Sequence, residues 1–159
     1  MKRPLVQLLV ILIVVLGAPY SASAATNTTV GAGGTYPSGT TFNGIPINGV
    51  QSGYGVKIGD NGSASGQFCT ILLGVSALGL EQDIRIEGKA TSGSQNSMNF
   101  VTFSGTCTVD MGDGTPPTPG VPFTATVTTD TNDQGTIGLV IGATTLPNAV
   151  VNAGSMTIK

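Results

Sequence analysis

The stretch Val101-Thr102-Phe103-Ser104-Gly105-Thr106-Cys107-Thr108-Val109 decides the fold, because larger apolar and hydroxyl-bearing side chains alternate along it with a period of two. The odd-numbered residues share one face, and the threonines and Ser104 share the other. This pattern is typical of a half-buried β-strand. The segments 83–87 and 121–128 repeat it. In residues 137–141 apolar side chains fall on both faces, which predicts a strand buried on both sides.

Turn-forming residues separate these strands. Asp60-Asn61-Gly62, Asn43-Gly44 and Asn48-Gly49 supply the positive φ angles that tight hairpins require. Gly112–Gly120 predicts a longer, proline-rich loop, and Ser92–Asn96 an exposed tip. Apolar residues at helical spacing are nearly absent, and residues 75–80 allow one helical turn at most. We therefore predict an all-β fold, an antiparallel β-sandwich or partly closed β-barrel of about seven to eight strands.

Residues 1–24 have the organisation of a secretory signal peptide. Lys2 and Arg3 precede an apolar run over residues 5–16, Pro19 breaks any helix, and Ala22-Ser23-Ala24 suits a signal peptidase. The alternative is an uncleaved membrane anchor, but the run is shorter than a bilayer requires. We expect a mature chain of residues 25–159 that is secreted or extracytoplasmic, in the periplasm or at the cell surface, with no stable membrane insertion after cleavage.

The mature chain divides into two parts. Residues 25–40, rich in Gly and Thr, predict a flexible leader or edge strand, and residues 41–159 predict a single β domain. Four basic residues stand against eight acidic ones, so the formal charge of the mature chain is −4. Scattered basic residues in an acidic chain give no electrostatic basis for binding nucleic acid.

The chain has two cysteines, Cys69 and Cys107. In an oxidising compartment we expect them to form one disulfide, which would stabilise the fold by roughly 3–4 kcal/mol. We place Cys69 on the face of Ile71 and Leu73, and Cys107 on the face of Phe103, so that both thiols point inward. A zinc or redox site is the alternative, but the sequence has no CxxC motif and no histidine.

No residue pattern predicts catalysis. Without histidine, Ser-His-Asp and Cys-His sites cannot be built, and no SxxK spacing accompanies the lysines. Asp83 and Glu87 share a strand face about 13 Å apart, too far for a glycosidase pair, and we expect them to flank Arg85 on a solvated outer face. We therefore predict no catalytic residues, no cofactor and no resident metal.

Asp110-Met111-Gly112-Asp113-Gly114-Thr115 is the most suggestive polar cluster. It resembles the DFGDGT stretch of polycystic-kidney-disease-type (PKD) β-sandwich domains, in which that segment is a structural turn. Met111 replaces the aromatic residue, and the paired HTY segment is absent. The resemblance implies a turn, and calcium bound by Asp110 and Asp113 is the alternative, although further acidic ligands are lacking.

Two wider resemblances cover most of the mature chain. The segments 62–68, 86–89, 102–107, 122–127 and 154–158 resemble small secreted bacterial β domains, which implies an antiparallel fold and no established reaction. In outline the chain is also similar to chaperone–usher pilins, which implies that residues 25–40 act as a donor strand. Cys69 lies farther from the mature N-terminus than the first cysteine of those pilins, and Ile158 replaces their penultimate tyrosine.

These observations give two functional hypotheses. The first is a non-enzymatic secreted or surface β module that binds a partner, either a protein or a small ligand. The second is a pilin-like structural subunit that self-assembles by β-strand exchange. An outer-membrane barrel is disfavoured, because the mature chain has few aromatic residues and ends in Lys159.

Overall fold

The computed structural model describes residues 25–132 and 134–159, so the predicted signal peptide lies outside the described residues. The described part is built from β-strands and contains no helix. Its ten strands are β1 (Thr26–Thr35), β2 (Thr41–Phe42), β3 (Ile45–Ile58), β4 (Ser63–Gly74), β5 (Ile84–Ser97), β6 (Phe100–Asp110), β7 (Thr118–Thr129), β8 (Gly135–Ile141), β9 (Thr144–Thr145) and β10 (Ala149–Ile158). The predicted all-β class is confirmed.

All strand pairs are antiparallel and belong to one ring-like sheet. The order β1-β10-β8-β7-β6-β5-β4-β3 returns to β1, because β1 also pairs with β3. The junctions differ greatly in length. β1 pairs with β3 over ten residue pairs and with β10 over eight, whereas β10 and β8 share only two. The ring is therefore only weakly joined between β8 and β10 and is not a regular barrel.

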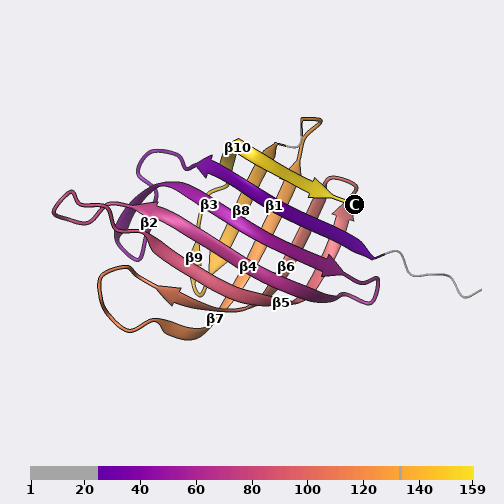
Figure 1. The fold of residues 1–159 in the computed structure, drawn as a ribbon, viewed down its shortest axis with the longest axis horizontal. Helices are drawn as coiled ribbons and strands as arrows, with labels where there is room; N and C mark the ends of the chain where they lie inside the picture. Colours follow the sequence, from indigo (N-terminus) through magenta and orange to yellow (C-terminus); the bar gives the residue numbers. More distant parts are fainter. Residues whose placement is uncertain (1–24, 133) are drawn as a thin grey trace, which may run out of the picture.

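The curled sheet forms two layers with the core between them. Figure 1 shows β1, β3 and β4 crossing in front of β6, β7 and β8. Four aromatic rings join the layers: Tyr54 of β3, Phe68 of β4, Phe103 of β6 and Phe123 of β7. Phe68 stacks on Phe123 with ring centroids 4.4 Å apart, and Tyr54 lies 5.3 Å from Phe103. This aromatic cluster fills the centre of the molecule.

The alternation read from the sequence is confirmed in β5, β6 and β7. Ile84 and Ile86 are fully buried while Arg85 and Glu87 are exposed, as expected for opposite faces of β5. The predicted inner face of β6 is also buried, except that Gly105 is partly exposed. In β8 the residues at 137–139 and 141 are all buried, so this strand is covered on both faces as predicted.

Two predicted hairpin turns are confirmed, and two local predictions are wrong. Residues 59–62 join β3 to β4, and Asn43 and Gly44, with φ of 48° and 83°, join β2 to β3. Asn48-Gly49 instead lies within β3 at a register shift. Ser92–Asn96 belongs to β5, because pairing with β6 continues to the turn at residues 98–99. Residues 75–80 form turns and an isolated bridge, which agrees with the limit of one helical turn at most.

The prediction of a flexible leader or edge strand over residues 25–40 is also wrong. β1 occupies residues 26–35 of this segment and lies between β3 and β10, so its backbone is paired on both sides. Val30 and Ala32 are buried in the core. Glycine-rich composition suggested mobility, but Gly31 and Gly33 alternate with inward-facing residues, and pairing on both edges outweighs the low strand propensity of glycine.

Two strand glycines provide a matched test of this packing. A Cβ on Gly88 would lie 2.5 Å from the Thr106 carbonyl oxygen and 2.8 Å from the Cys107 Cβ, whereas a Cβ on Gly53 would meet nothing within 4 Å. We expect Gly88→Ala to lower the free energy of unfolding by about 1–3 kcal/mol through overpacking. We expect Gly53→Ala to raise it by about 0.4–1 kcal/mol by restricting the unfolded chain.

Urea denaturation of the three proteins measures both changes. Equal effects of the two alanines would contradict the close approach of β5 and β6 at Gly88.

Candidate functional site

The predicted disulfide between Cys69 and Cys107 is wrong, because both cysteines are free. Cys69 lies on β4 opposite Glu87 of β5, and Cys107 lies on β6 opposite Gly88 of β5. A whole strand therefore separates the two thiols. Adjacent strands lie about 4.8 Å apart, so two strand spacings exceed the Cα separation that a disulfide spans.

The error comes from the face assigned to Cys69. Phe68, Thr70, Leu72 and Gly74 are the buried residues of β4, while Cys69 and Leu73 lie on the half-buried outer face. Residues 68–73 carry apolar side chains on both faces, so a period of two fits either assignment. Cys107 points inward as predicted and is 3% exposed.

The two thiols differ in environment. The Cys107 Sγ donates a hydrogen bond to the Val121 carbonyl oxygen at 3.3 Å, and burial raises the pKa of Cys107 to about 11. Partial burial also raises the pKa of Cys69, the negative charge of Glu87 adds to this shift, and Arg85 opposes it. Neither thiol is therefore activated as a nucleophile at neutral pH.

This arrangement predicts two free thiols per chain after purification without reductant. In the folded protein we expect iodoacetamide at pH 8 to modify Cys69 well before Cys107, because Cys107 is buried and retains its proton. Peptide mass mapping under non-reducing conditions measures both properties. A peptide linking Cys69 to Cys107 would contradict the strand register. The Cys69→Ser variant is the control, and it should leave only the slow reaction until the protein is denatured.

The acidic residues of β5 and the loop after β6 have local partners. Arg85 and Glu87 lie on an exposed outer face, as the sequence predicted, and they form an ion pair at 3.3 Å. Asp110 accepts a hydrogen bond from the Gly112 amide. Asp113 accepts bonds from the Thr115 amide and hydroxyl, and the bond from the hydroxyl is the main cause of its lowered pKa. These contacts are those of Asx turns.

The turn interpretation of residues 110–115 therefore has direct structural support. Gly112 has a φ of 67°, and a Cβ there would collide with the Asp83 carbonyl oxygen, so this position requires glycine. Within the described ranges, no three His, Cys, Asp or Glu side chains are grouped so that they could hold a metal ion. Calcium binding by Asp110 and Asp113 stays an untested alternative.

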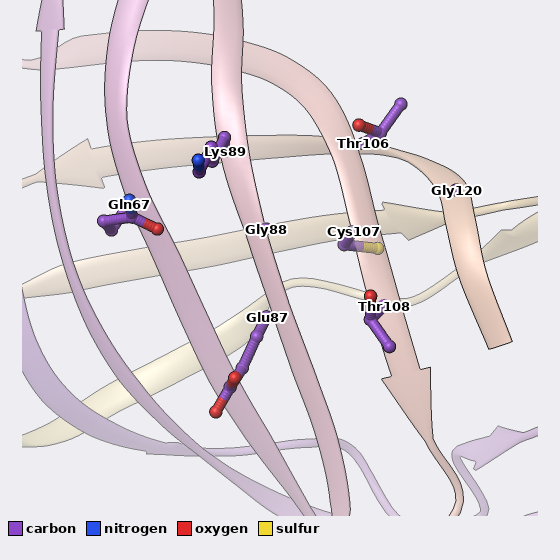
Figure 2. A pocket seen from close by; sticks show the side chains of 8 residues that line it. All are labelled: Gln67, Glu87, Gly88, Lys89, Thr106, Cys107, Thr108 and Gly120. Atoms are coloured by element: carbon purple, nitrogen blue, oxygen red, sulfur yellow. The ribbon is translucent and has the colours of Figure 1, made fainter. Parts of the chain in front are cut away.

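A shallow depression of about 450 Å³ lies on the outer surface of β4, β5 and β6. Figure 2 shows its polar side chains, with Gln67, Glu87 and Lys89 on one side and Thr106 and Thr108 on the other. Gly88 lies between Glu87 and Lys89 on β5, and Cys107 lies between Thr106 and Thr108 on β6. We call this the polar depression. Apart from Glu87, these polar side chains have no hydrogen-bond or ion-pair partner within the described part of the chain.

The close approach of β5 and β6 forms the base of the polar depression. Gly88 pairs with Cys107 in the strand register. Because Gly88 has no Cβ, the two backbones lie closer together than any larger residue at this position would allow. Alternation then directs the flanking side chains, Glu87 and Lys89 on β5 and Thr106 and Thr108 on β6, to the outer surface. The hydrogen-bonding groups are therefore fixed on strands rather than on loops.

A second depression, of about 500 Å³, adjoins the first across β4. Its base contains Gly31 and Gly33 of β1, Gly53 of β3 and Ala153 of β10. Strand register aligns Gly31, Gly53, Cys69, Glu87 and Thr108 in one row across five strands. Cys69 lines the second depression, and it pairs with Glu87, which lines the polar depression. We call the second one the glycine-rich surface.

Hydroxyl groups collect on the inner face of β1, β3 and β4. Ser52 and Thr70 are bonded to each other at 3.0 Å. The buried hydroxyls of Thr28, Tyr36 and Tyr54 have no partner among the described residues. Burial raises the pKa of both tyrosines well above its usual value, and for Tyr54 the proximity of Tyr36 adds to the shift.

The Tyr54→Phe variant removes an unbonded hydroxyl, so we expect its free energy of unfolding to stay constant or to rise by about 1 kcal/mol. The matched control Ser52→Ala leaves Thr70 unpaired and should cost about 1–2 kcal/mol. Unfolded tyrosine ionises near pH 10 whereas folded Tyr54 keeps its proton, so stability should fall as pH rises above about 10.

Tyr54→Phe should reduce this loss of folding stability at alkaline pH. Urea denaturation at pH 7 and at pH 11 measures each effect, and a large loss of stability in Tyr54→Phe at pH 7 would show that the hydroxyl is bonded.

Sequence reasoning missed both depressions. Glu87 was placed correctly on a solvated face, but Gln67, Lys89 and Thr106 were not connected with it, because their proximity depends on the register of three strands. No family model, curated protein or solved structure matches this chain. In the described residues, no helix is long and apolar enough to cross a membrane.

Proposed function

We propose that this chain is a non-enzymatic secreted or surface β module that binds a partner through the polar depression. The observation that supports this proposal is a set of five hydrogen-bonding side chains, all on β-strands, that surround the backbone of Gly88 and Cys107. Lys89 and the amide of Gln67 supply donors, Glu87 supplies an acceptor, and the hydroxyls of Thr106 and Thr108 supply both. Rigid strands hold these groups in place, which lowers the entropy cost of binding.

The lining favours a hydrophilic partner over an apolar one. The depression is open and contains no aromatic side chain, and charged and hydroxyl groups surround it. The interior of the ring is instead filled by the aromatic cluster and the aliphatic residues around it. We therefore favour a carbohydrate or a polar polypeptide segment as the partner, bound on the outside of the sheet.

The test uses arrays of oligosaccharides and of polar peptides, probed with labelled wild-type protein. The double variant Lys89→Glu/Thr106→Arg reverses one charge and fills part of the depression. We expect it to lose roughly tenfold or more in affinity for any probe that the wild type binds.

Lys57→Glu is the matched control, because Lys57 is exposed on the same sheet but outside the depression. It should bind like the wild type. Absence of binding to every probe, or equal losses in both variants, would contradict the proposal.

The alternative, a pilin-like subunit that assembles by β-strand exchange, has less support. Exchange requires a strand that can leave its own subunit and a groove that lacks a strand. In this chain β1 is already paired along both edges, with β3 and with β10. Its removal would break both junctions and expose Val30 and Ala32.

A further inference from the structure

We propose that the free edge of β10 is an interaction surface that pairs with β10 of a second copy of this chain. β10 is bonded to β1 along one edge over eight residue pairs. Along its other edge it meets β8 only at Ala149 and Val150. Residues 151–158 therefore have no strand partner on that side within the described residues. Figure 1 shows β10 as the outermost long strand of the front layer.

The register identifies the backbone groups that face this free edge. Asn27 and Lys159 exchange both of their backbone hydrogen bonds, so they form a hydrogen-bonded pair of the β1–β10 ladder. Alternation along the ladder then directs the backbone of Thr157 and Ser155 toward β1. The intervening residues Ile158, Met156 and Gly154 direct their N–H and C=O groups to the free edge.

This edge lacks most of the usual protection against strand pairing. Natural sheets protect exposed edges with lysine, proline, β-bulges or a covering segment. In β10 the register with β1 shifts at Asn152, which lies at one end of the free edge. β10 contains no charged residue and no proline. Residues 152–155 are exposed, so neither another strand nor a loop of the described chain covers this part of the edge. Gly154, which has a φ of 80°, has no side chain that could cover the edge at this position.

The edge is complementary to itself, which identifies the partner as a second copy. An antiparallel pair centred on Ser155 places Met156 of one copy opposite Gly154 of the other, and Ile158 opposite Asn152. Regular pairing then covers residues 153–157 of both copies, and Asn152 lies at the register shift of β10. Lys159 lies at opposite ends of the two strands, so no like charges meet.

Other free strands do not match this length. β2 and β9 have two residues each. The segments 93–97 of β5 and 118–122 of β7 extend beyond their pairing with β4 and β8, and each is shorter than the free edge of β10, which spans residues 151–158. A second copy therefore pairs through the same strand in both subunits. The contact is isologous, so assembly stops at a two-fold dimer with one sheet continuous across both rings.

The test is a charge-swap experiment at Ser155, which is exposed and lies on the two-fold axis of this pairing. The protein is expressed from its full coding sequence, and its mass is measured by light scattering over a concentration series. We expect the wild type to change from one chain to two. Ser155→Lys and Ser155→Glu each place like charges opposite one another and should weaken the dimer roughly tenfold or more.

An equimolar mixture of the two variants should restore the dimer, because the introduced lysine of one copy would then face the introduced glutamate of the other. Gln51→Lys is the matched control. Gln51 is exposed on the same sheet, but β1 separates its strand β3 from β10, so this variant should dimerise like the wild type.

Four results would overturn the proposal. They are a constant mass of one chain for the wild type, unchanged dimers in both Ser155 variants, a mixture that stays monomeric, and masses that grow beyond two chains. The first means that the edge is unoccupied or accepts another protein, and the last means that a different contact drives assembly.

Discussion

The packing of four aromatic rings between the two layers is the contact on which the rest of the structure depends. Tyr54, Phe68, Phe103 and Phe123 come from four different strands, and each ring touches at least one from the other layer. The sheet must therefore curl until β3 and β4 face β6 and β7. Once it has curled, β1 meets β10, and the outer face of β5 and β6 becomes the polar depression.

The sequence predicted the fold class well and the tertiary arrangement poorly. Alternation along β6 and β7 is unambiguous, because hydroxyl side chains occupy every outer position except Phe100, Asp110, Gly120 and Pro122. Cys69 shows where this reasoning stops. Its neighbours are apolar on both sides of the strand, so no pattern indicates its face, and the predicted disulfide depended on that choice. The prediction of a flexible leader or edge strand at residues 25–40 was wrong for a related reason, because composition does not reveal which strands pair.

The polar depression and the glycine-rich surface could not be predicted for a physical reason. Each consists of residues that are adjacent across strands and distant along the chain, such as Gln67, Lys89 and Thr106. Each residue alone has the character of an ordinary exposed position. The low charge of the chain, with 9% of its residues charged, makes such surfaces harder to find, because no cluster of charges marks them.

The adjacency of β1 and β10 has a consequence for the way this protein is made. The first and last long strands of the described chain are neighbours, and their pairing spans almost the whole length of the domain. Contacts between distant residues close slowly, because a long chain must first be brought together. During synthesis from the N-terminus, the edge of β1 that pairs with β10 stays unpaired until β10 has been made. The ring therefore closes only once β10 has followed the other strands, and a partly synthesised chain lacks the β1–β10 junction.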